Sequence, residues 1–473
     1  MFRRILSRAA EPILMLSLAI LPVACGGGGT GPVASAPAVP PPAVPPPAWR
    51  PAVDLEATGY VSGAALAGDG KGGVIAAWIR TGLDAGGTAY WEQVATRLRP
   101  EGTWESLLTL ERTSLSDVLQ APVAALDDQG KGLVAWFSAL PRSTITALRT
   151  MPVDLSAASI FGTRVNGLTL DLRTPGNLAL AVGSDGSALA AWTFTRDIGW
   201  GVFTPAVFAS RRNPTGGWSA PRGYQLNQLS HQNLQGVSGN NRGAFLLEFS
   251  TGDDAWEENQ VASFASGSDV GVAVPGWMPT TQIALPAGRI SAIAGDGLGG
   301  LETFLLYSMS GEGDAQRQAW PRSCPSTGQW TVGGKVALPL PTNNLVAFRE
   351  ATGTGWLAGL GSQGLWVAPL TGVTPGPPRA LLPATTTTEV LIGARDSAGR
   401  PALLWVQRGT GGTDEGIGFS RWDGAAWTAP VILPGTEGRS IQRLFATAGP
   451  SGLMAGWVDA TTSTLRFRTA LWK

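Results

Sequence analysis

The 473-residue sequence has only two cysteines, Cys25 and Cys324, and a single histidine, His231. Two thiols exclude a disulfide framework, and no cluster of histidine and cysteine exists that could bind zinc. Charged residues make up only 14% of the chain, with 34 basic and 34 acidic side chains. No strong basic field is present to attract nucleic acid. We therefore predict no cofactor, no metal and no nucleic-acid partner.

Glycine and proline are abundant instead, at 64 and 35 residues. A high content of both is typical of a chain with many short strands and tight turns, and a helical bundle would have a different composition. Length alone is a weak guide to domain number, because large all-β folds can run long as single units. The composition therefore favours an all-β fold.

The first 24 residues combine Arg3, Arg4 and Arg8 with an apolar run at residues 12–20. This run is too short to span a bilayer and is typical of a secretory signal peptide. The segment resembles a bacterial lipoprotein signal, in which Cys25 becomes the lipidated first residue of the mature chain. Pro22 stands where that pattern usually has leucine, so a plain secretory signal is the alternative.

A tether follows the signal. Residues 26–29 are all glycine, and residues 32–47 are rich in proline, a composition that gives a flexible segment and then a stiffer spacer. The predicted organisation is a signal peptide at residues 1–24, a tether at 25–48 and one folded domain at 49–473. Gly26 replaces the aspartate that would retain a lipoprotein in the inner membrane, so the expected location is the cell envelope, at the outer membrane.

One sequence motif recurs along the folded domain: a short apolar strand, a turn of the Asp-Gly type, and a second apolar strand that usually ends in tryptophan. Asp-Gly supplies the positive φ that a tight hairpin needs. The clear copies are about 50 to 60 residues apart or multiples of that, and weaker copies surround residues 240–241, 296–297 and 352–353. The clear copies end at Trp78, Trp136, Trp192, Trp405 and Trp457.

Short-strand repeats of this length indicate a β-propeller of about eight four-stranded blades, with seven as the alternative. The last repeat ends before its fourth strand, while residues 49–55 have the character of a fourth strand. We therefore expect the N-terminal strand to complete the last blade and close the ring, because closure removes unpaired sheet edges.

The repeats resemble those of bacterial propeller lipoproteins and, more distantly, the Asp-box repeats of sialidase-type propellers. The resemblance covers residues 49–473, and it concerns motifs of the fold rather than of an activity. One eight-bladed propeller lipoprotein serves outer-membrane protein assembly, which makes that role an analogy. A sialidase-like hydrolase would be expected to use an arginine cluster, an acid and a tyrosine nucleophile.

Evidence for catalysis is thin in the sequence. A lone histidine is more often a structural residue than a base. Of the four tyrosines, Tyr90 and Tyr307 are expected on connecting loops, where a nucleophile could lie. Arginines recur at equivalent third-strand positions, which indicates a role in the blade. Calcium at the turn aspartates is conceivable, but hairpin formation explains them better. These aspartates are Asp69, Asp127, Asp128, Asp185, Asp296 and Asp396.

Binding residues are expected in the long connections between second and third strands, which should all emerge on one face of a propeller. Trp91, Trp200 and Trp256 fall there, outside the repeat, together with an excess of acidic residues. Loops that are simply solvated and charged are the alternative. The candidate ligand-binding residues are Trp91, Trp200, Asp253, Asp254, Trp256, Glu257 and Glu258. We expect a non-catalytic binding or scaffold protein with an unidentified protein or glycan partner, held to the membrane by a lipid on Cys25. A glycan-active hydrolase is the alternative.

Overall fold

The computed structural model describes residues 48–56, 60–115, 119–139, 146–157, 159–170, 175–197, 203–224, 231–239, 245–253, 256–264, 288–295, 301–307, 318–324, 331–332, 336–340, 342, 344–349, 354–372, 374–408, 414–460 and 464–473. The chain divides into two units, Met1–Pro46 and Pro47–Lys473. The predicted signal peptide, tether and lipidated Cys25 lie outside the described residues. All described regular structure is β-strand, and none of these residues forms a helix long and apolar enough to cross a membrane.

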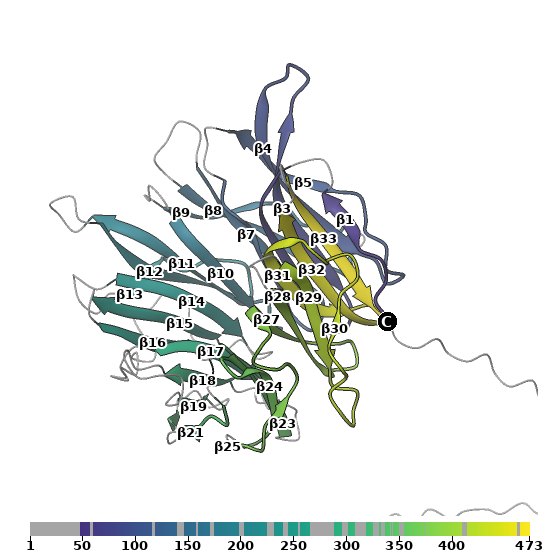
Figure 1. The fold of residues 1–473 in the computed structure, drawn as a ribbon. Helices are drawn as coiled ribbons and strands as arrows, with labels where there is room; N and C mark the ends of the chain where they lie inside the picture. Colours follow the sequence, from purple (N-terminus) through teal and green to yellow (C-terminus); the bar gives the residue numbers. More distant parts are fainter. Residues whose placement is uncertain are drawn as a thin grey trace, which may run out of the picture. The chain divides into compact units, whose positions relative to one another are not determined.

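The described strands form eight antiparallel sheets, numbered here in chain order (Figure 1). Sheet 1 contains β2 (Val61–Gly68), β3 (Val74–Leu83), β4 (Ala89–Leu98) and β5 (Leu108–Ser114). Sheet 2 contains β6 (Val123–Leu126), β7 (Lys131–Ala139), β8 (Thr146–Asp154) and β9 (Val165–Leu170). Sheet 3 contains β10 (Pro175–Val182), β11 (Ala188–Asp197), β12 (Phe203–Arg212) and β13 (Arg222–Tyr224). Sheet 4 contains β14 (His231–Gly239), β15 (Phe245–Asp253) and β16 (Trp256–Phe264).

The second half of the domain repeats the same order with shorter outer strands. Sheet 5 contains β17 (Gly288–Gly295), β18 (Leu301–Tyr307), β19 (Gln318–Cys324), β20 (Thr331–Val332) and β21 (Val336–Ala337). Sheet 6 contains β22 (Asn344–Arg349), β23 (Thr354–Gly361), β24 (Gly364–Thr371), β25 (Thr374–Pro375) and β26 (Arg379–Ala380). Sheet 7 contains β27 (Thr387–Arg395), β28 (Pro401–Arg408), β29 (Asp414–Arg421) and β30 (Val431–Ile432). Sheet 8 contains β31 (Ser440–Gly449), β32 (Gly452–Ala460), β33 (Leu465–Trp472) and β1 (Val53–Glu56).

The N-terminal strand completes the last sheet, as the sequence predicted. β1 pairs antiparallel with β33, where Val53 lies opposite Thr469, and Trp49 forms a bridge with Trp472. The backbone amide of Arg50 also donates to the carbonyl of Leu471 over 2.8 Å. These bonds cover the outer edge of β33, which would otherwise be left unpaired.

The first strands of neighbouring sheets contact one another. β2 touches both β31 and β6, β6 touches β10, and β10 touches β14. In the second half, β22 touches β17 and β27, β27 touches β31, and sheets 4 and 5 meet through β16 and β17. Small residues permit the approach, because a Cβ at Gly63 of β2 would run into Ala121, and one at Gly68 would run into Thr447 of β31.

The core lies between sheets rather than within one layer. One buried cluster joins Trp78 of sheet 1 to Phe467 of sheet 8, and another joins Phe137 of sheet 2 to Trp192 of sheet 3. The rings of Trp78 and Phe467 meet edge to face at 5.6 Å. Second strands are buried along both faces, as the run from Val74 to Ile79 shows. The five tryptophans of the clear repeats are fully buried, which confirms their predicted role as packing residues.

Sheet 6 explains why its repeat is hard to recognise in the sequence. In sheet 7 the buried Trp405 of the second strand lies opposite Gly418 of the third strand. In sheet 6 the two residue types exchange strands, so that Trp366 of the third strand lies opposite Gly359 of the second. In both sheets a Cβ on the glycine would overlap the indole ring. The packing is the same, although the second strand of sheet 6 lacks the tryptophan that ends the repeated sequence motif.

The hairpin between the first and second strands is stabilised by its aspartate. The Asp69 carboxylate accepts hydrogen bonds from the backbone amides of Lys71 and Gly73, at 2.7 and 2.8 Å. Asp127 and Asp396 do the same in their own hairpins. Gly70 supplies the left-handed turn residue, with φ at 75°. These contacts give Asp69, Asp127 and Asp396 a structural role in their hairpins.

Candidate functional site

A cavity of about 510 Å³ lies where the first strands of four sheets come together. Its wall is formed by the segment that leads into β6, by β10 and by single residues of β14 and β31. These elements belong to sheets 2, 3, 4 and 8, so residues far apart in the sequence meet in one place. The lining residues are Gln120, Ala121, Pro122, Val123, Gly176, Asn177, Leu178, Ala179, Leu234 and Arg443.

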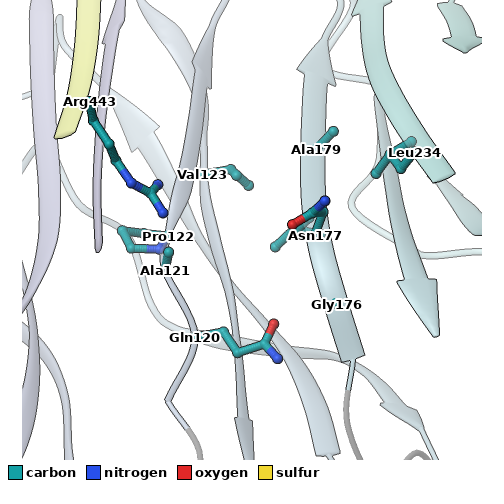
Figure 2. Close-up of a pocket in the computed structure, with 10 residues that line it drawn as sticks. Gln120, Ala121, Pro122, Val123, Gly176, Asn177, Ala179, Leu234 and Arg443 are labelled. Atoms are coloured by element: carbon teal, nitrogen blue, oxygen red, sulfur yellow. The ribbon is translucent and has the colours of Figure 1, made fainter. Parts of the chain in front are cut away.

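The polar side chains of the lining come from different walls. Figure 2 shows Arg443 and Asn177 extending into the space from opposite sides, with Gln120 below them. Val123 and Leu234 contribute aliphatic surface. Arg443 is exposed, and its guanidinium forms no ion pair or side-chain hydrogen bond with the described part of the chain.

β-Bulges shape this end of the first strands. Pairing between β10 and β11 passes from Pro175 directly to Leu178, which leaves Gly176 and Asn177 without ladder partners. A comparable register shift in β31 lies between Ile441 and Arg443, next to the cavity. A bulge bends its strand and re-aims the side chains beside it. Of the eight first strands, β2, β10, β14, β17, β27 and β31 carry such a shift.

The cavity and the connections between second and third strands lie at the same end of the sheets. The start of β10 pairs with the end of β11, where Pro175 lies opposite Phe194. Likewise, Ile441 at the start of β31 lies opposite Asp459 near the end of β32. The cavity therefore lies toward the end of the sheets that the sequence predicted to carry function, but its lining belongs to the first strands and to the segment before β6.

None of the described candidate residues lines this cavity. Trp91 lies within β4, where it pairs with Thr81 and Thr113, and its side chain is partly buried. Asp253 ends β15 and pairs with Trp256 at the start of β16. The expectation that these residues occupy loops is therefore wrong, because the hairpins extend further than the apolar pattern indicates.

The remaining candidates divide between strand and undescribed positions. Glu257 and Glu258 belong to β16, opposite Gly252 and Thr251. Trp200 and Asp254 lie outside the described residues. The structure therefore neither gathers the seven candidates into one site nor tests them as ligand contacts.

A second polar cluster lies on sheet 1 and contains the residue types of a sialidase-like centre. Glu92 of β4 forms ion pairs with Arg80 at 2.8 Å and Arg112 at 2.9 Å. It also accepts a hydrogen bond from Thr109, and the Arg112 guanidinium lies 4.1 Å from the ring centre of Tyr90. Tyr90 lies in β4 and Tyr307 ends β18, so neither occupies the loop expected of it.

The Glu92 carboxylate is already occupied. Burial raises its pKa, but hydrogen bonds from Arg112, Thr109 and Arg80 outweigh burial and lower the pKa below its ordinary value. Its side chain is only 1% exposed. A general acid in a glycosidase needs a raised pKa and access to the leaving-group oxygen. This cluster therefore has the properties of a structural ion-pair network.

Sequence reasoning missed the cavity because its residues occupy the first strands, which the repeat pattern assigned to packing alone. The sequence feature that could have indicated the cavity is a local break in the alternation of apolar and polar residues along the first strands. Polar residues stand at or beside the shifted positions, as Asn177 and Gln442 do. No group of three or more potential metal ligands occurs among the described residues.

Comparison with known proteins identifies no family. No family model matches the sequence, and no curated protein matches it either. Among solved structures, polysaccharide lyase Uly1 has a TM-score of 0.44 at 8% identity, over 89% of this chain and 98% of that one. The acylaminoacyl peptidase of Pyrococcus horikoshii has a TM-score of 0.42 at 11% identity, over 85% of this chain. This chain spans 57% of that peptidase.

A sialidase of Trypanosoma rangeli, solved with sialic acid, is also similar, with a TM-score of 0.36 at 9% identity. The alignment covers 90% of this chain and 59% of the sialidase. Similarity at this level carries no argument about activity.

Proposed function

We propose that residues 49–473 form a closed β-propeller of eight blades that serves as a non-catalytic binding protein at the bacterial cell envelope. The described strands form eight sheets that follow one another along the chain, and neighbouring sheets are in contact. The pairing of β1 with β33 supports closure, because the first strand of the domain completes its last sheet.

The cavity among the first strands carries the binding role. Its described lining combines one guanidinium and two carboxamides with aliphatic side chains and glycine. It contains no carboxylate, imidazole, hydroxyl or thiol, and these are the groups that act as general acids, general bases or nucleophiles. Such a lining can hold a ligand by hydrogen bonds and charge, but it supplies no group to transfer a proton.

A direct screen tests this function. We expect the purified protein to bind members of a glycan array or a panel of envelope proteins, and to release no fluorophore from a panel of fluorogenic glycosides. Arg443→Ala should weaken binding, whereas Arg400→Ala should not. Arg400 is a matched control because it is also exposed. It lies in the Asp396 hairpin, where the first strand of sheet 7 ends, whereas the cavity lies where first strands begin. Turnover of any glycoside would refute the non-catalytic assignment.

The anchor is a separate part of the proposal and rests on the sequence around Cys25. A lipidated cysteine would hold the propeller to the outer membrane through its acyl chains. We expect Cys25→Ser to abolish labelling by a palmitate analogue and to release the protein from the membrane fraction. Cys324→Ser is the matched control and should leave labelling unchanged. Equal labelling of the wild type and the Cys25 variant would disprove lipidation.

A further inference from the structure

The charge of the cavity points to an anionic ligand group. Arg443 is the only ionised residue in the described lining, and the described residues provide no counter-ion for it. A guanidinium presents a planar fork of donors that matches a carboxylate in a bidentate arrangement. An exposed arginine beside a cavity, with no counter-ion among the described residues, is therefore suited to pair with a carboxylate from outside the chain.

The rest of the lining favours a peptide over a sugar. Carboxamides such as Asn177 both donate and accept hydrogen bonds, which suits the amide groups of a main chain. The apolar part of the described lining is aliphatic, with Val123, Leu178 and Leu234, and contains no aromatic ring. Sugar sites generally use aromatic platforms, whereas aliphatic side chains pack well against an apolar amino-acid side chain.

The surrounding backbone offers further hydrogen-bonding groups. β6, β10 and β31 are each the outermost strand at one side of their sheets. An edge strand has unpaired N–H and C=O groups, and these groups can bind an extended peptide. The bulge at Gly176 and Asn177 adds two residues that have no ladder partner. The cavity volume of about 510 Å³ suits the end of a chain rather than a folded partner.

We propose that the cavity binds the free C-terminus of an extended peptide with an aliphatic last residue. Arg443 pairs with the terminal carboxylate, Asn177 binds a main-chain amide, and the last side chain packs on Val123, Leu178 and Leu234. This inference rests on the proposed function as a binding protein and names the ligand class for the same site.

An array of random hexapeptides attached through their N-termini tests the proposal, with each sequence prepared as a free carboxylate and as a C-terminal amide. The probe is the full-length protein in detergent. We expect peptides ending in valine, leucine or isoleucine to bind, and the carboxylate form to bind about tenfold or more tightly than the amide, as expected for a charge-assisted pair. Arg443→Gln should remove this preference, and Arg400→Gln should keep it.

Thermal unfolding of both variants should match the wild type, because Arg443 and Arg400 are exposed. Equal binding of the carboxylate and amide forms would overturn the inference. So would a carboxylate preference that survives Arg443→Gln, or Arg443-dependent binding of oligouronates in place of peptides. These results leave the binding function in place, whereas glycoside turnover would refute that function without testing the carboxylate preference.

Discussion

Arg80 of β3 and Glu56 of β1 form an ion pair, with 3.2 Å between Nη1 and Oε2. Glu56 belongs to the strand that completes sheet 8, and Arg80 belongs to sheet 1. Glu56 also accepts a bond from Nε1 of Trp78, at 3.4 Å. β1 thus pairs with the last sheet through its backbone, and it contacts the first sheet through the side chain of Glu56, its last residue.

A pair of truncations tests this junction. We expect removal of residues 26–46 to leave the urea midpoint of unfolding unchanged, because those residues precede the compact unit that begins at Pro47. Removal of residues 26–56 should lower the midpoint or cause aggregation, since it exposes the edge of β33 and deprives Arg80 of one partner. Coincident unfolding curves would show that β1 contributes nothing to the domain.

The ionisation of Glu92, which also pairs with Arg80, should make the stability of the domain depend on pH. Its pKa is lowered in the folded protein, so its ionised form stabilises the fold above the unfolded-state value of about 4.3. This contribution should disappear as the pH falls from that value through the lower folded-state pKa.

Urea midpoints of the wild type and Glu92→Gln, measured from neutral to acidic pH, check this prediction. The wild type should be the more stable at neutral pH, and the difference should shrink below about pH 4.3. Glu437→Gln is the control, because that side chain is exposed and lies outside the Glu92 cluster. A Glu92→Gln difference that is constant across the pH range would argue against a role for its ionisation.

Close packing of the first strands predicts a cost for one added methyl group. A Cβ at Gly63 would overlap the Cβ of Ala121, which leads into β6. We expect Gly63→Ala to destabilise the domain by about 1–3 kcal/mol through overpacking. Gly162→Ala is the matched control, because a Cβ there meets Pro152 at an ordinary 3.5 Å. Equal unfolding free energies for the two variants would mean that the first strands separate easily.

The tryptophans of the repeat should differ in energy from the tryptophan beside it. Trp78 is fully buried, so Trp78→Ala should cost about 3–5 kcal/mol. Trp91 is only partly buried, so Trp91→Ala should lower the free energy of unfolding clearly less. It should also weaken the binding of any ligand that contacts the hairpin of β3 and β4. The free energies of unfolding of both variants test this prediction. Equal decreases would show that Trp91 is a core residue.

Much of the architecture was readable from local chemistry. The Asp69 hairpin and the burial of Trp78 depend on residues close to one another in the chain, and both were predicted. The pairing of β1 with β33 was also predictable, because a missing fourth strand at one end matched a surplus strand at the other. Sheet 6 was harder, because Trp366 and Gly359 have exchanged strands while their packing is retained.

The candidate site was predicted less well. Trp91 and Trp256 lie outside the repeat, but hairpin length depends on cross-strand pairing that the pattern does not record, and the structure places both in strands. The cavity depends on Gln120, Asn177 and Arg443, which are separated by long stretches of sequence. Nothing near any one of them indicates that the three share a space.

The sequence by itself determined the strands, the hairpin turns, the buried tryptophans and the strand that completes sheet 8, because hydrophobic alternation, turn chemistry and edge pairing are local or follow from counting repeats. Only the tertiary structure decided that β6, β10, β14 and β31 converge, and that a bulge leaves Asn177 without a ladder partner there. It also decided that the Arg443 guanidinium has no ion-pair partner among the described residues. These properties arise from contacts between sheets, where distance along the chain carries no information about distance in space.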